Sequence, residues 1–121
     1  MYLPFKDGDN LRIPELPSIK SISEKELANI WKTISDKPLP EAHAFTLDEK
    51  DFDYMLNVVQ KNPGVKDSRV REYGVDFDNS LIEAFSFKAN DYFVILIKQS
   101  APLKDSLEHE LKHIQNDAYG I

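Results

Sequence analysis

The sequence predicts an α+β domain with a small, mostly antiparallel sheet, and three observations support this prediction. Apolar residues recur at helical spacing in the first half of the chain and again near its end. Between these stretches the spacing changes to the alternation of a half-buried strand. The chain has 121 residues, of which 41% are apolar, and this suits one domain with its own core. Helices at both ends with strands between them are typical of the α+β class.

Two helices are predicted before the strands. Residues 23–26 read Ser-Glu-Lys-Glu, a capping box in which the serine and a glutamate satisfy free backbone N–H groups at a helix start. This helix should end near Lys37, because a proline follows. Residues 46–49 read Thr-Leu-Asp-Glu, which is a second capping box. The Asn-Pro-Gly sequence at residues 62–64 should end the helix that it opens.

Two or three strands and a last helix are predicted next. Residues 73–77 alternate in polarity as a half-buried strand does, and residues 81–88 form a second predicted strand. A tight turn at residues 90–91 leads into the apolar run 92–97, which lacks alternation and should be buried on both faces. The final helix begins near Pro102, because a proline in a first helical turn loses no hydrogen bond.

The chain divides into an arm and a domain. Residues 1–22 contain three prolines and no sustained period, which predicts an extended N-terminal arm. Its apolar residues suggest that the arm packs on the rest of the chain. Residues 23–121 form the predicted domain, and no internal repeat is present in the sequence.

Composition narrows the class of protein. A net charge of −6 provides no basic surface for nucleic acid or an anionic membrane. The chain has no cysteine, so a disulfide, a thiolate nucleophile and a cysteine metal site are all excluded. The first residues do not resemble a signal peptide, and the longest apolar run is too short to cross a bilayer. We therefore expect a cytoplasmic protein, and nothing in the sequence indicates an oligomeric state.

The candidate site is the sequence His-Glu-Leu-Lys-His at residues 109–113. Two histidines four residues apart on a helix stand about 40° apart around the axis and roughly 6 Å apart along it, so both imidazoles can reach one ion. Imidazole is a preferred ligand of zinc. Glu110 adjoins the first histidine and can reach a water on the ion, which is where a general base is needed. The pattern therefore predicts a Zn²⁺ site formed by His109 and His113.

A helical wheel shows which residues surround the two histidines on the predicted helix. His109 and His113 share one strip between an apolar face and a charged face, as on a helix that lines a cleft. The apolar face consists of Leu103, Leu107, Leu111, Ile114 and Ala118. The alternative interpretation is a pair of surface histidines on an ordinary amphipathic helix.

Residues 109–114 resemble the active-site helix of the HExxH zincin metallopeptidases. The preceding order of helix, sheet, buried strand and short loop is similar to metallopeptidase-like domains of the ImmA/IrrE type and to minimal gluzincin-like peptidases. This resemblance implies a peptidase in which His109 and His113 bind zinc. It implies that Glu110 polarises the water and passes its proton to the leaving amine. It also implies that an edge strand, residues 81–87 or 92–98, holds an extended peptide or protein substrate.

The sequence departs from that family at two points. Lys112 stands where zincins commonly have a small residue, so its side chain must point to solvent. The usual third ligand is missing, and Asp117 is the candidate to replace it if the helix unwinds after Ile114. On a straight helix Asp117 is about 12 Å along the axis from His109, and its role is then to orient His113. The alternative function is a non-catalytic zincin-fold binding module with an incomplete metal site.

Four further residues were considered for the site. His43 is predicted to lie in a loop before the second helix, where a histidine is usually solvated. Glu83 interrupts an apolar strand and is predicted to point outward from an edge strand. Trp31 is predicted to belong to the core. Tyr119 can offer a phenol to an oxyanion, but packing is the more common role near a chain end.

Overall fold

The computed structural model describes residues 6–7, 10–11, 16–61, 82–89 and 92–120. The strand predicted at residues 73–77, the helix-ending sequence at 62–64 and the turn at 90–91 lie outside these residues. The elements are β1 (Lys6–Asp7), β2 (Asn10–Leu11), β3 (Lys20–Ser21), α1 (Glu24–Ile34), β4 (Ala42–Leu47), α2 (Glu49–Lys61), β5 (Ala84–Ala89), β6 (Tyr92–Lys98) and α4 (Leu103–Tyr119).

Four strands form the main sheet, in the order β3-β4-β6-β5. β4 runs parallel to β6, whereas β3 pairs antiparallel with β4 and β5 pairs antiparallel with β6. The predicted α+β class is confirmed, but the sheet is mixed, because a parallel pair lies at its centre. β6 is hydrogen-bonded to a strand on each side. All seven of its residues are buried, so the prediction that this strand is buried on both faces is correct.

The β4 strand was not predicted. Its sequence, Ala-His-Ala-Phe-Thr-Leu, is buried or half-buried at every position and therefore lacks the alternation that marks a one-sided strand. The predicted capping box was also wrong, because Thr46 lies inside β4. The residue that caps α2 is Asp48, whose Oδ1 accepts a hydrogen bond from the backbone N–H of Asp51 at 2.9 Å.

The α1 helix begins as predicted. The Ser23 side chain accepts a hydrogen bond from the backbone N–H of Glu26 at 3.2 Å. The helix ends at Ile34, earlier than the predicted Lys37. The chain turns there because the indole N–H of Trp31 donates to the carbonyl of Lys37 at 2.6 Å, which draws the following loop over the helix end. Trp31 is buried, as predicted for a core residue.

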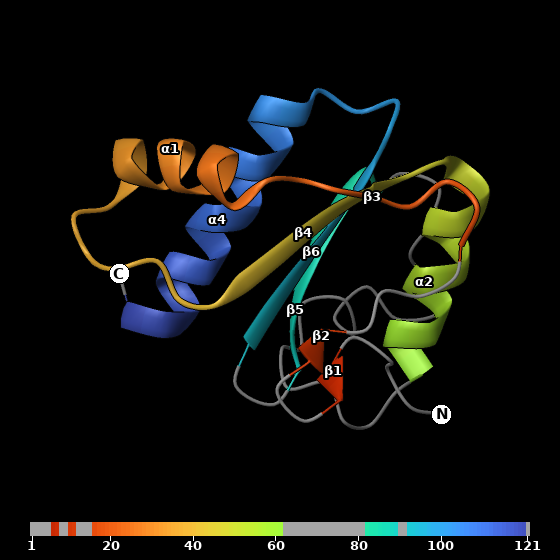
Figure 1. Ribbon diagram of the computed structural model, residues 1–121, viewed down its shortest axis with the longest axis horizontal. Helices are drawn as coiled ribbons and strands as arrows, with labels where there is room; N and C mark the ends of the chain where they lie inside the picture. Colours follow the sequence, from red (N-terminus) through yellow and green to blue (C-terminus); the bar gives the residue numbers. More distant parts are fainter. Residues whose placement is uncertain (1–5, 8–9, 12–15, 62–81, 90–91, 121) are drawn as a thin grey trace.

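The domain has three layers, with α2 on one face of the sheet and α1 and α4 on the other (Figure 1). Each face carries its own apolar cluster, because alternate residues of a strand point to opposite faces. Phe45, Phe85 and Phe87 face α2, whereas Ala44 and Ile95 face α1 and α4. Among the described residues, no helix is both long enough and apolar enough to cross a membrane.

The described part of the N-terminal arm lies against the sheet and α2. Leu16 and Ile19 pack on the α2-side cluster, and β3 adds to the edge of β4. Ser18 donates from its backbone N–H and its hydroxyl to the buried carboxylate of Asp51, at 3.1 and 2.5 Å. These contacts fix the chain just before α1. The division of the chain at residue 22 remains a prediction.

The packing of α4 can be tested by truncating its buried side chains. Leu107 and Leu111 are fully buried between α4 and the sheet. Leu111→Ala or Leu107→Ala should lower the free energy of unfolding by about 2–5 kcal/mol, since each leaves a cavity. Urea unfolding measures this loss. Leu103→Ala is the matched control, because Leu103 is 36% exposed and should lose much less. Unchanged stability in both core variants would contradict the assignment of this face.

Candidate metal centre

The candidate site lies in the middle of α4, where a helix is most rigid. α4 runs from Leu103 to Tyr119, and Gly120 ends it in the left-handed conformation with φ 69°. His109, Glu110 and His113 are each more than one turn from either end of the helix. Their spacing is therefore set by regular helix geometry rather than by a loop.

The contacts of α4 show where its histidines point. Leu107, Leu111 and Ile114 face the sheet. On a second side, α4 meets α1: Gln115 donates from its side-chain amide to the carbonyl of Ile34 at 3.1 Å, and Tyr119 donates from its hydroxyl to the carbonyl of Pro38.

The histidines lie on the side of α4 that contacts neither the sheet nor α1, which we call the histidine flank. At about 100° per residue, His109 and His113 lie roughly 150° around the helix from the sheet-facing side and about 120° from the side that meets α1. α4 contacts both β6 and β5, and β5 is the last strand of the sheet. The histidine flank of α4 is therefore turned away from both the sheet and α1, in keeping with the exposure of His109.

The two imidazoles converge. His109 Nε2 and His113 Nε2 are 3.0 Å apart, and the ring centroids are 4.5 Å apart with an interplanar angle of 89°. Two nitrogens that each lie about 2 Å from a tetrahedral zinc ion are about 3.3 Å apart. The observed separation is close to that value. The same distance also fits a hydrogen bond from one neutral imidazole to the other.

Glu110 completes the group. One carboxylate oxygen of Glu110 and one nitrogen of each histidine all lie within 4.8 Å of one another. Glu110 is only 4% exposed, whereas His109 is exposed and His113 is half-buried. A buried carboxylate is costly unless it has polar or cationic partners. Two imidazoles and a carboxylate are a donor set that suits zinc.

Two sequence-based expectations concern the rest of α4. The helix continues without unwinding through Asp117 to Tyr119, so the condition for Asp117 to turn back toward the ion is not met. Asp117 is exposed and does not belong to the three-residue group. Lys112 points to solvent as required, and its ammonium lies 3.2 Å from the carboxylate of Glu108.

The other candidates lie outside the group. His43 was expected in a loop but lies in β4, where its Nε2 is 2.8 Å from a carboxylate oxygen of Glu41. Glu83 is exposed and just precedes β5, so it does not enter the core. Tyr119 packs against the loop after α1. Of the two strands considered as edge strands, β6 is internal and only β5 ends the sheet.

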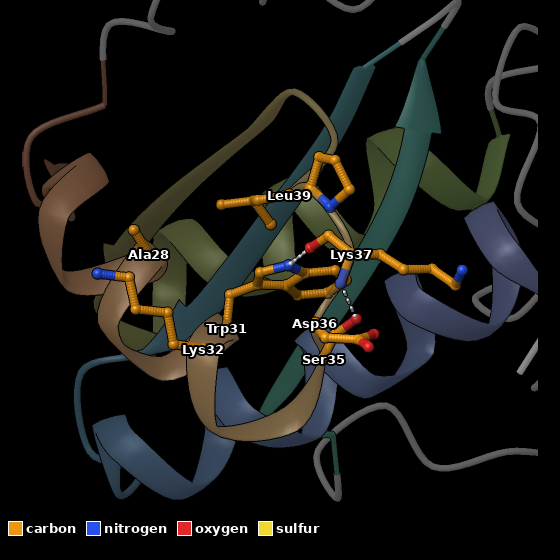
Figure 2. Close-up of a pocket in the computed structure, with 8 residues that line it drawn as sticks. Ala28, Trp31, Lys32, Ser35, Asp36, Lys37 and Leu39 are labelled. Carbon is orange, nitrogen blue, oxygen red and sulfur yellow. Dashed lines mark hydrogen bonds between the residues drawn. The ribbon is translucent and has the colours of Figure 1, made fainter.

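A pocket of about 560 Å³ lies at the C-terminal end of α1 (Figure 2). Trp31 and Leu39 are apolar parts of its lining. Lys37 also contributes, but its ammonium is directed away, 5.5 Å from the ring centre of Tyr119. Lys32 and Asp36 provide opposite charges at its rim. The pocket belongs to α1 and the loop that follows it, and neither His109 nor His113 lines it.

Comparison with protein-family models, curated proteins and solved structures gives no match for this chain. The interpretation of the site therefore depends on its own geometry and on the sequence pattern at residues 109–113.

Zinc titration tests the metal centre directly. Isothermal calorimetry of the wild-type protein should show one Zn²⁺ bound per chain, with release of up to about two protons at acidic pH as the imidazoles lose them. His113→Ala should weaken binding steeply, because it removes one of two convergent nitrogens. Lys112→Ala is the control on the same helix and should bind as the wild type does. Equal affinity in wild type and in a variant that lacks both histidines would exclude this site.

Proposed function

We propose that this protein is a zinc-dependent peptidase whose metal ion is held by His109 and His113. The observation that carries the proposal is the 3.0 Å approach of the two Nε2 atoms beside the buried carboxylate of Glu110. The short separation of the two Nε2 atoms, the choice of imidazole as ligand and the neighbouring carboxylate together suit metal-assisted hydrolysis. The resemblance of residues 109–114 to the zincin helix supports the same reaction.

Each side chain has a defined part in this reaction. Zinc, when bound, is a Lewis acid that polarises a carbonyl and makes water acidic enough to give up a proton near neutral pH. His109 and His113 hold the ion through neutral imidazole nitrogens. Glu110 accepts the proton of the attacking water and then donates it to the nitrogen of the leaving amine, so the carboxylate ends as it began.

The substrate is proposed to lie along β5. An extended peptide can add to the end of a sheet through backbone hydrogen bonds. In the described part of the chain, β5 is bonded to β6 on one side only. α4 packs on β5, and Glu110 lies on the side of the helix nearest this strand, so a peptide added there would lie on the same side of α4 as Glu110. The class of substrate is thus an extended segment of peptide or protein.

A second candidate function follows from the number of protein ligands that the group offers to a metal ion. Catalytic zinc sites commonly have three protein ligands and a water. In the described residues the group has two imidazoles and Glu110. If Glu110 itself binds the ion, no base remains beside it, and the protein is a binding module with a structural or weakly held metal. Elemental analysis of the protein after dialysis without chelator is the first experiment that distinguishes the two functions. The peptidase requires bound zinc, whereas the binding module can exist without metal.

Replacement of Glu110 separates the two functions. In the peptidase, Glu110→Gln should retain zinc affinity but lower turnover by a factor of about 10² or more, because the amide is not a base. In the module, the same change should weaken zinc binding and there is no turnover to lose. Cleavage of a broad peptide library by the zinc-loaded wild type is measured first.

Glu108→Gln is the matched control for this experiment. Glu108 lies on the same helix but pairs with Lys112 rather than with the histidines. Its replacement should leave both turnover and zinc affinity unchanged. A zinc-loaded wild type that cleaves nothing would refute the peptidase, and equal cleavage by Glu110→Gln would refute the role of Glu110.

A further inference from the structure

One row of β5 faces α4. Ala84 packs in the cluster that contains Leu107 and Leu111, and side chains two residues apart on a strand share a face. Lys88 confirms the direction of this row, since its ammonium lies 5.5 Å from the ring centre of Phe93, its cross-strand partner on the α4 side. Ser86, between these two positions, therefore points toward α4.

Ser86 is an unusual residue for this interface. It is 3% exposed, and its Oγ has no hydrogen-bond partner among the described residues. Buried hydroxyl groups are almost always hydrogen-bonded, because an unpaired one loses its contact with water without replacement. Alanine would fill nearly the same space at lower cost. A hydroxyl at such a position is available to an acceptor that approaches it from the facing helix.

Glu110 faces the same interface from the opposite side. On the helix it lies between the sheet-facing side and the histidine flank, which is the side of α4 nearest β5. Ser86 pairs with Ile95 in the sheet, and Ile95 belongs to the same cluster as Leu111, the neighbour of Glu110. The buried hydroxyl and the buried carboxylate thus both enter the layer between α4 and the sheet, on the β5 side of the helix.

We propose that Ser86 is a positioning residue that donates a hydrogen bond from its Oγ to the carboxylate of Glu110 when the metal site is loaded. A carboxylate has about four acceptor positions, so this bond adds to the other contacts of Glu110. One carboxylate oxygen of Glu110 is then held by the Ser86 hydroxyl of β5, and the other carboxylate oxygen is directed to the water. This contact rests on the metal site of the proposed function, but not on peptide cleavage.

A double-mutant cycle measures the contact without any substrate. Ser86→Ala, Glu110→Ala and the double variant are unfolded in urea, with saturating Zn²⁺ and without it. With zinc, Ser86→Ala should raise the unfolding equilibrium constant about tenfold more in the wild-type background than in the Glu110→Ala background, as expected for a hydrogen bond to a charged group. Asp105→Ala, on the exposed first turn of α4, replaces Glu110→Ala in the control cycle and should show no coupling with Ser86.

Coupling below about twofold in both conditions, or stabilisation by Ser86→Ala regardless of background, would overturn the proposal. If Glu110→Ala does not fold, a crystal structure of the zinc-loaded wild type decides. Ser86 Oγ should then lie about 2.6–3.2 Å from a Glu110 carboxylate oxygen, and a separation beyond about 4 Å would contradict the contact. If the protein cleaves peptides, Ser86→Ala should lower kcat more than KM changes, and Ser86→Thr should restore it. Coupling without cleavage would retain the contact and refute only the peptidase.

Discussion

The rotation of α4 about its own axis is the constraint on which the rest of the site depends. Three buried aliphatic residues fix one side of the helix on β5 and β6, and hydrogen bonds to the α1 end and its loop fix a second side. A shift of one residue turns a helix by about 100°, which would turn the histidines toward the sheet or toward α1. Because both sides are held, the flank that carries the imidazoles stays clear of both the sheet and α1.

The burial of Glu110 determines which partners its carboxylate needs. A carboxylate that is 4% exposed is disfavoured as an anion unless positive charge or donors surround it. A divalent cation at the adjacent imidazoles would supply that charge, and a hydroxyl from β5 would supply a donor. The proposed metal ion and the proposed serine contact would therefore both stabilise the same buried carboxylate.

The parts of the fold that follow from local sequence were predictable. The capping serine of α1, the apolar stripe of α4 and the four-residue spacing of its histidines all depend on neighbours within a turn or two. β4 was missed, because its parallel partner β6 lies about fifty residues further along the chain and both of its faces are covered. His43 was misplaced for the same reason.

The relation between the site and the sheet also depends on distant contacts. Among the described strands, β5 ends the sheet and β6 is internal. The continuous apolar run of β6 predicted burial on both faces, but it did not show which strands pair with its two edges. Ser86 alternates with two phenylalanines, which suggests a solvated side chain, yet α4 covers it. Only the packing of the helix shows that this hydroxyl is buried.

X-ray absorption spectroscopy of the zinc-loaded protein can show whether the two imidazoles of α4 hold one zinc ion, because imidazole rings give a characteristic scattering pattern around the metal. Two imidazole nitrogens should lie about 2.0 Å from the zinc, with oxygen in the remaining positions. A zinc environment made of oxygen alone, or one unchanged when His109 and His113 are both replaced by alanine, would exclude the proposed site.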